Sequence, residues 1–240
     1  MHTITNPLGQ PIGPHVSDWT PRALPVRTPM QGRFCRLEPL ELALHGADLH
    51  AAYAADTEAR MWTYLSYGPF ATPADLEAWH ARVAATRDPL FFAIRDATTG
   101  RAVGAAAYLR IDPNAGSIEV GHLAFSPALA RTPAATEAMF LMMKHAFTLG
   151  YRRYEWKCDA LNARSRAAAL RLGLSFEGVF RQAGVYRDRN RDTAWFAAVD
   201  SEWPALRAAH ERWLAPGNFD TEGRQRERLS DLTAPLLVKR

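Results

Sequence analysis

Hydrophobic and polar positions change their spacing repeatedly along this chain, and each change predicts a new element. Cys35 and Leu37 alternate with Phe34, Arg36 and Glu38, as the two faces of a strand do. Leucine and alanine then recur at helical spacing over 40–53. The same reasoning predicts further strands at 90–95, 102–111, 117–125, 153–158, 176–186 and 193–199, and further helices at 72–85, 133–149, 162–172 and 203–213.

Local signals mark several of these boundaries. Thr72 can cap a helix whose first position suits Pro73, and Asp75 favours its positive end. Gly150 and Gly173 follow the last periodic residues of two later helices, where glycine commonly ends a helix. The last two strands should form a hairpin across 187–191.

The order of elements predicts the fold class and the division of the chain. Short strands joined by turns, with helices before and after them, indicate an α+β domain with a mixed sheet whose halves part around a ligand. Six prolines precede Met30 without a sustained apolar period. We therefore expect an irregular N-terminal arm over 1–31, a domain over 32–203, and a C-terminal helix and tail over 204–240.

Composition narrows the setting. A hydrophobic content of 48% is enough for a sizeable core, while no apolar run approaches the roughly 18 residues of a membrane span. The N-terminus lacks a signal-peptide pattern, so we expect a cytoplasmic protein without a membrane partner. The net charge of +4 is spread along the chain, which disfavours nucleic acid. Two separated cysteines predict no metal.

One segment suggests a ligand. The predicted strand from Glu119 to Phe125 enters a loop of small residues and then a helix that starts near Pro133. The first N–H groups of a helix lack partners within it and are well placed to bind phosphate. A pyrophosphate site is one interpretation, and an ordinary strand-turn-helix connection is the other.

The loop resembles the acetyl-coenzyme A site of the GNAT superfamily of N-acetyltransferases, in its RimJ/RimL-like branch. Aligned on the helix start 136–138, the family pattern Q/R-x-x-G-x-G/A places Ala130 at the basic position, Pro133 at the first glycine and Ala135 at the last position. Two of these three positions depart from the pattern. Arg131, one place along, can compensate through its side chain. The resemblance implies cofactor contacts from Leu123, Phe125, Arg131, Thr132, Ala134, Ala135 and Thr136.

A second resemblance lies downstream. Residues 162–165 and 171–181 are similar to the N-x-x-S helix and the L-G-F-x-x-E-G strand start of this branch, and Trp203 matches its Glu-Trp ending. The resemblance implies that Asn162 contacts the pantetheine arm, and that Ser165 contacts the cofactor and protonates the leaving thiolate. It also implies a GNAT-like, largely antiparallel sheet with a splayed central strand pair.

Amide formation at a thioester needs a base, an oxyanion donor and an acid. Several GNAT enzymes carry a glutamate where Glu119 stands, which makes it the candidate base; the alternative is a glutamate on a solvated strand face or paired across the sheet. The glutamate that some RimL-type enzymes carry further on is absent, because Gly184 follows Arg181-Gln182-Ala183. The resemblance places the oxyanion donor among the main-chain N–H groups near Leu123 or Phe125.

Aromatic residues predict the acceptor pocket. The run 61–70 should be a packed loop whose side chains line an apolar site, or alternatively pack the first two helices together. His122 is a further possible contact, although a histidine in an apolar strand is commonly a core residue. The predicted substrate-binding residues are Trp62, Tyr64, Leu65, Phe70, His122 and Tyr186.

These observations predict an N-acetyltransferase that uses acetyl-CoA. The acceptor would be a primary amine of a small molecule, an amino acid derivative or a protein N-terminus. The altered loop and the missing downstream glutamate leave open a non-catalytic acyl-CoA-binding regulator or scaffold. The helix at 203–213 and the tail that follows it offer a possible homodimer surface.

Overall fold

A computed structural model describes residues 4–238 of the chain. Within that range, one sheet of eight strands has the order β3-β4-β5-β6-β7-β8-β10-β9. Neighbouring strands are antiparallel, except that β7 and β8 are parallel. The strands are β3 (Met30–Gln31), β4 (Cys35–Pro39), β5 (Leu90–Asp96), β6 (Ala102–Asp112), β7 (Ser117–Phe125), β8 (Arg153–Asp159), β9 (Ser175–Tyr186) and β10 (Arg189–Val199).

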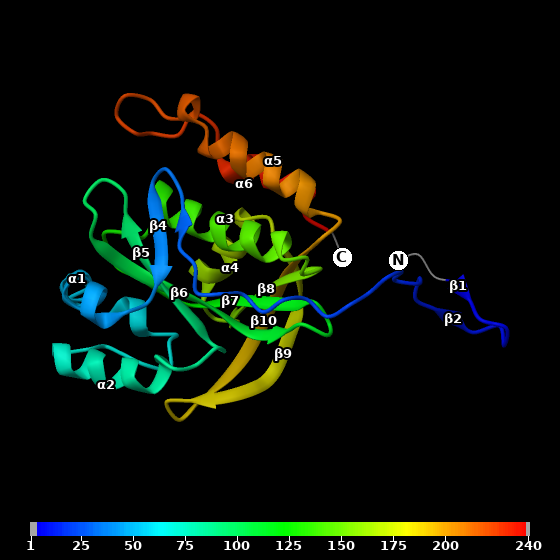
Figure 1. Ribbon diagram of the computed structural model, residues 1–240, viewed down its shortest axis with the longest axis horizontal. Coiled ribbons are helices and arrows are strands. Elements are labelled where there is room, and N and C mark those ends of the chain that lie inside the picture. The colour runs from blue at the N-terminus through cyan, green and yellow to red at the C-terminus, as the bar shows by residue number, and fades with distance from the viewer. Residues whose placement is uncertain (1–3, 239–240) are drawn as a thin grey trace.

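Helices cover both faces of the sheet (Figure 1). In Figure 1, α1 and α2 lie on one face, and α3 and α4 on the other. The helices are α1 (Leu42–Ala54), α2 (Pro73–Val83), α3 (Pro133–Thr148), α4 (Ala163–Arg171), α5 (Trp203–Leu214) and α6 (Leu229–Thr233), with short 3-10 turns η1 (Arg60–Trp62), η2 (Pro216–Asn218) and η3 (Ala234–Leu236). Within residues 4–238, none of these helices combines the length and apolar character that crossing a bilayer requires.

The sheet separates two hydrophobic cores. Phe92 belongs to the core beneath α3 and α4, whereas its neighbour Phe91 belongs to the core with Trp79 of α2. Successive residues of a strand point to opposite faces, so an apolar run such as β5 fills both cores. This arrangement explains why β5 has no polar alternation over Leu90–Ile94, where every residue is buried.

The central strand pair is splayed. β7 and β8 pair from Ser117 with Arg153 up to Val120 with Trp156. Beyond that pair β7 continues to Phe125 and β8 to Asp159 without further pairing between them. This confirms the predicted α+β fold with a mixed, largely antiparallel sheet and a parted central pair.

A buried carboxylate fastens the start of the sheet to α3. Glu137, 5% exposed, accepts hydrogen bonds from the backbone N–H groups of Arg33 (2.8 Å), Phe34 (2.6 Å) and Cys35 (2.9 Å). A Cβ at Gly32 would collide with this carboxylate, so a side chain there would force the Glu137 carboxylate to shift. A single charged side chain therefore satisfies three N–H groups that have no strand partner to receive them.

The last hairpin is tighter than the sequence predicts. We expected a connection over 187–191, but β9 ends at Tyr186 and β10 begins at Arg189. Arg187 and Asp188 form a two-residue turn with φ values of +49° and +58°. Such left-handed turns match the twist of the paired strands, so the strands continue further than their apolar pattern indicates.

The terminal segments behave differently from each other. The short pair β1 (Ile4–Thr5) and β2 (Pro11–Ile12) extends away from the sheet in Figure 1. The C-terminal segment packs onto the domain, with Trp213 and Leu229 in the core beneath α3 and α4. The apolar face of α5 is thus occupied by the chain's own core, and a homodimer surface over this helix and the tail stays a prediction. The limits of the three predicted segments stay a prediction.

Candidate functional site

A cleft of 1440 Å³ opens where β7 and β8 part. The N-terminal turn of α3 and the N-terminal turn of α4 border it, as do the loop after α1 and the segment after α5. Eight of the nine predicted cofactor contacts line this cleft: Leu123, Phe125, Arg131, Thr132, Ala135, Thr136, Asn162 and Ser165. Ala134, the ninth, is 4% exposed and packs inward instead.

The β7 wall carries a bulge. Ala105 of β6 pairs with Ala124 and Ala107 pairs with Gly121, so two residues of β7 oppose one of β6. His122 lies in this bulge with φ of +52°. Bulges disrupt the ladder locally and re-aim backbone and side chains, which is a common device beside active sites. Here it lies at the point where β7 turns away from β8.

At the start of α3, much of the N-terminal hydrogen-bonding capacity is already used. The Thr132 hydroxyl accepts from Ala135 N–H (3.2 Å) and donates to the Leu129 carbonyl (2.7 Å). Pro133, at the first helical position, has no N–H. Arg131 adopts φ of +66° and lines the cleft just before the helix. Main-chain donors for an anion are therefore fewer than a glycine-rich loop provides.

The opposite wall is built by β8 and α4. Asn162 caps α4, because its Oδ1 accepts from Ser165 N–H at 3.0 Å. The Ser165 hydroxyl oxygen accepts from the indole N–H of Trp156 at 2.9 Å. An indole N–H only donates, so this contact does not use the hydroxyl proton of Ser165, which faces the Cys158 sulfur as a hydrogen-bond acceptor. Asn162 can therefore cap α4 while the hydroxyl of Ser165 remains on the wall of the cleft.

Glu119 is the centre of a buried ion network. It is 3% exposed, which excludes a solvated strand face. Both carboxylate oxygens lie 2.8 Å from Nη1 of Arg110, and Oε2 lies 2.9 Å from Nζ of Lys157. Lys157 also contacts Glu155 at 2.7 Å and lies 3.8 Å from the Trp195 ring centroid. Burial raises the pKa of Glu119, and the two cations act in the opposite direction.

The loop after α1 forms part of the acceptor side. Tyr64 and Leu65 line the cleft, as does His122 of β7. Trp62, at 2% exposure, and the partly buried Phe70 instead pack in the core with Tyr53. These two aromatics follow the alternative interpretation, in which the loop is packed under the helices. They bury large apolar surfaces, and neither reaches the cleft.

His122 is held in an apolar setting. Its ring stacks against Tyr67 at 5.6 Å and contacts Phe91 at 5.1 Å between centroids. Burial lowers the pKa of His122 to about 4, so the ring is neutral near pH 7. The Tyr67 hydroxyl donates to the His122 carbonyl at 3.4 Å. The residue thus combines the core role with a place at the cleft wall.

Tyr186 reaches the site through a residue that the sequence did not single out. Its hydroxyl donates to Asp159 at 2.9 Å, and Asp159 lines the cleft although Tyr186 does not. Burial and the Asp159 carboxylate raise the pKa of the Tyr186 phenol. Arg191 lines the same region, and its buried Nε has no hydrogen-bond partner within residues 4–238. Asp159 and Arg191 therefore add charged groups to the lining of the cleft.

Sequence reasoning missed the residues that reach the cleft through long-range packing. They come from β6, β8, β10, the end of α4, the end of α5 and the segment after it: Arg110, Trp156, Lys157, Asp159, Arg171, Arg191, Trp213 and Phe219. The sequence predicts the strand at 153–158, but the parallel pairing of β7 and β8 that brings Lys157 to Glu119 is seen only in the structure. No local signal marked the segment after α5.

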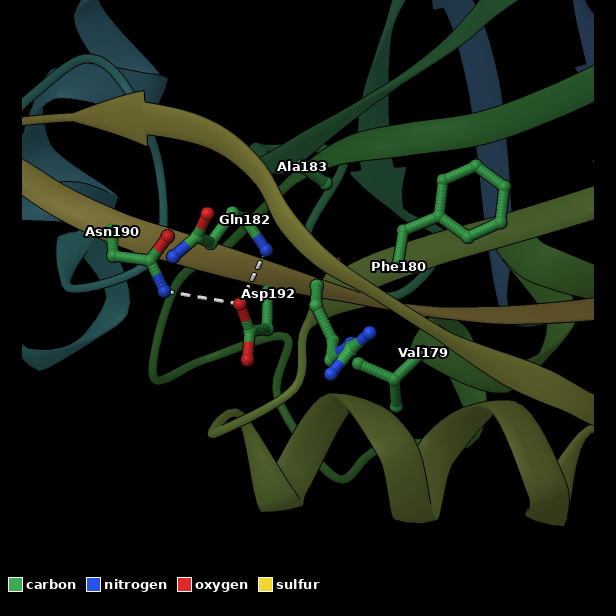
Figure 2. Close-up of a pocket in the computed structure, with 7 residues that line it drawn as sticks. Val179, Phe180, Gln182, Ala183, Asn190 and Asp192 are labelled. Carbon is green, nitrogen blue, oxygen red and sulfur yellow. Dashed lines mark hydrogen bonds between the residues drawn. The ribbon is translucent and has the colours of Figure 1, made fainter.

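A second hollow lies on the β9–β10 hairpin and contains none of the predicted site residues (Figure 2). Asp192 accepts there from Gln182 N–H at 2.7 Å and from the Asn190 side chain at 3.0 Å. It is more open than the cleft, and at 760 Å³ it is also smaller. The cleft between β7 and β8 is therefore the candidate site.

Comparisons with known proteins agree with this architecture. Residues 35–175 match the model of the acetyltransferase (GNAT) domain. A GCN5-related N-acetyltransferase from Brucella melitensis is 48% identical with a TM-score of 0.89, over 91% of this chain and 100% of that one. A probable GNAT-family acetyltransferase from Chromobacterium violaceum ATCC 12472 is 41% identical with a TM-score of 0.76, over 82% and 98%. Mycobacterium smegmatis RimJ, solved with CoA-disulfide, shares the fold at 19% identity and a TM-score of 0.61, over 77% and 92%.

Among curated proteins, none matches this sequence. The family model covers more than half of the chain, and the Brucella melitensis structure extends the likeness over nearly all of it. The chain therefore belongs to the GNAT acetyltransferase family. Acetyl transfer is the activity that this membership supports.

Proposed function

We propose that this chain is an acetyl-CoA-dependent N-acetyltransferase. It would acetylate a primary amine of a small molecule, an amino acid derivative or a protein N-terminus by direct attack in a ternary complex. The observation that carries the proposal is the cleft between the parted ends of β7 and β8, which brings Glu119 and Ser165 to one cavity. One wall of the site would then take the proton of the attacking amine, and the other wall would protonate the departing thiolate.

The residues present fit acetyl-CoA as the donor, which supplies the acetyl group as a thioester. Leu123, Phe125 and Asn162 border the gap between the strands and would flank the pantetheine arm. Arg131 and the first turn of α3 would hold the diphosphate. Pro133 lacks an N–H, and the N–H of Ala135 already donates to the Thr132 side chain. Side-chain cations would therefore supply part of the binding of the diphosphate.

Glu119 would act as the base. Three cation contacts use about three of the roughly four lone-pair sites of a carboxylate, which leaves capacity for an amine proton, directly or through one water. Burial makes this carboxylate more basic by raising its pKa. Arg110 and Lys157 would hold it in place during the transfer.

Ser165 would act as the acid. Its hydroxyl oxygen accepts from the indole N–H of Trp156, and its own proton, which that contact does not use, would pass to the departing thiolate. The backbone N–H groups of Leu123 or Phe125, next to the bulge in β7, would donate to the carbonyl oxygen as negative charge develops there. All three groups belong to walls of the same cleft.

We also propose that the protein is of the RimJ/RimL type and works in the cytoplasm. Residues 162–165 and 171–181 carry this assignment from the sequence side. Tyr64, Leu65 and His122 would contact the acceptor, since they line the cleft beside Glu119. The acceptor's identity depends on the shape of this pocket rather than on any single motif.

Calorimetric titration with acetyl-CoA, followed by a thiol-release assay across a panel of amines, tests the proposal. We expect binding of acetyl-CoA and amine-dependent release of free thiol. Absence of binding by both acetyl-CoA and CoA would refute it. A denatured sample and a panel of alcohols serve as controls for hydrolysis and for non-amine acceptors.

The runner-up is a non-catalytic acyl-CoA-binding regulator. One observation favours it: Glu119 is held by two cations, which stabilise its ionised form and oppose its taking a proton. Binding of acetyl-CoA without turnover on any amine would support this second function. The same two experiments therefore separate the two proposals.

A further inference from the structure

Arg171 brings a positive charge into the cleft from the end of α4. Its Nη1 donates to the Thr136 hydroxyl of α3 at 3.0 Å, and its guanidinium carbon lies 5.1 Å from the ring centroid of Trp213 in α5. All three residues line the cleft. The guanidinium is thus positioned by one residue from each of two other helices.

This cation has no anionic partner in the described part of the chain. Its guanidinium contacts a neutral hydroxyl and an aromatic face, and no carboxylate of residues 4–238 forms an ion pair with it. Burial lowers the pKa of Arg171, with no neighbouring charge acting against it. A partly desolvated guanidinium without a counter-charge is stabilised by binding an anion, and its planar fork suits phosphate oxygens.

The segment after the family domain forms a wall beside this cation. We call Trp213, Phe219, Gly223, Arg224 and Gln225 the C-terminal wall; all five line the cleft, and all lie beyond residue 175, where the family match ends.

Contacts among its own residues hold the C-terminal wall together. The indole N–H of Trp213 donates to Gln225 at 2.8 Å, and Phe219 packs edge-on against Trp213 at 5.3 Å between centroids. Arg224 is already paired with Asp220 and Glu222, so its charge is compensated. Arg171, which contacts Trp213 of this wall, has no such ion pair within residues 4–238.

The loop before α3 has Arg131 as its one cation and departs from the family pattern at two positions. Ala130 stands where the family pattern has a basic residue, and Pro133 removes one N–H donor. Thr136, to which Arg171 donates, belongs to the beginning of the same helix. A cation that reaches this helix from α4 can add a second positive charge to that of Arg131, because phosphate binding depends on where the donors lie and not on which segment supplies them.

We propose that Arg171 binds the phosphate groups of coenzyme A, and that the C-terminal wall encloses the nucleotide half of that molecule. This inference rests on the proposed function, since it assigns further residues to the same cofactor cleft. It gives the C-terminal segment a direct part in cofactor binding.

Calorimetric titration of the full chain with CoA, 3'-dephospho-CoA and pantetheine tests the proposal. Arg171→Met should weaken CoA binding by roughly 10- to 100-fold, the usual effect of losing a charge-assisted hydrogen bond. Pantetheine has no phosphate, and its affinity should stay unchanged. Arg171→Lys keeps the charge but loses the fork, so it should weaken CoA binding less than methionine does.

Arg207→Met is the matched control. Arg207 is an exposed α5 residue that pairs with Glu211 and does not line the cleft, so CoA affinity should not change. Circular dichroism and thermal melting of each variant confirm folding, and the lysine variant carries the test if the methionine variant unfolds.

The three ligands distinguish the sources of phosphate. An equal loss with CoA and 3'-dephospho-CoA assigns Arg171 to the diphosphate, and a loss confined to CoA assigns it to the 3'-phosphate. Unchanged CoA affinity in Arg171→Met, or an equal loss with pantetheine, overturns the inference while wild-type binding leaves the proposed function intact. Failure of the wild-type chain to bind CoA overturns both.

Discussion

The ammonium of Lys157 lies 2.9 Å from Oε2 of Glu119, and Lys157 directly follows the last residue of β8 that pairs with β7. The side chains of Lys157 and Glu119 are 6% and 3% exposed. Taking one partner of such a buried pair away leaves an uncompensated charge, whereas the intact network of Arg110, Glu119, Lys157 and Glu155 balances itself. The candidate base is thus fixed in position at the point where the cleft opens.

Glu119→Gln should lower turnover without a comparable loss of acetyl-CoA binding. The amide keeps the shape but cannot take a proton, and general-base catalysis contributes about 10²- to 10⁴-fold. We expect kcat to fall by about 10²-fold or more, while the calorimetric Kd for acetyl-CoA changes by less than about threefold. Glu211→Gln, at an exposed site on α5, is the control. Unchanged turnover would remove Glu119 from the mechanism.

The acid limb of kcat/KM should follow the pKa of Glu119. The base works when ionised, so activity rises as pH increases through that pKa, which burial raises. Arg110 opposes the rise; Arg110→Met should therefore raise the pKa further and move the limb to higher pH. The amine's own ionisation is the same in both proteins and cancels in the comparison. Arg101→Met is the control, and a limb that stays in place would contradict the assignment.

Ser165→Ala should lower kcat by about 10-fold or more while acetyl-CoA binding is retained, because the thiolate then leaves without a proton donor. Trp156→Phe is the informative companion: it removes the indole N–H that reaches Ser165 and keeps the hydroxyl. A smaller loss in Trp156→Phe than in Ser165→Ala supports the acid role. Steady-state kinetics of the two variants give both values of kcat, and an equal loss of kcat in the two would contradict the acid role.

Glu137→Ala should destabilise the fold. It leaves the N–H groups of Arg33, Phe34 and Cys35 without their acceptor, and buried donors left unsatisfied cost about 1 to 3 kcal/mol each. We expect the free energy of unfolding, measured by urea denaturation, to fall by about 3 kcal/mol or more. Glu77→Ala on the exposed face of α2 should change it by less than about 0.5 kcal/mol. Equal stability of the two variants would show that this contact is dispensable.

Local signals in the sequence determined the elements and several of their ends. Thr72 and Asp75 form the reciprocal cap of α2, and Asn162 caps α4. Each of these contacts spans only three residues, so the local sequence is enough to indicate it. The resemblance to the GNAT family predicted the splayed strand pair and the segments that form the two walls of the cleft. The sequence did not predict the two-residue turn at Arg187 and Asp188, because the length of that turn depends on the register of both strands.

Tertiary structure decided which side chains share the cleft. The sequence names Glu119 and Ser165, but it does not show that Lys157 pairs with Glu119, since that contact requires β7 and β8 to lie parallel. Arg171 donates to Thr136 over a separation of 35 residues, and it meets Trp213 only after α5 folds back. Periodicity reports a residue's neighbours within a few positions, whereas burial, charge pairing and the shape of the cleft arise from segments that meet only in the folded chain.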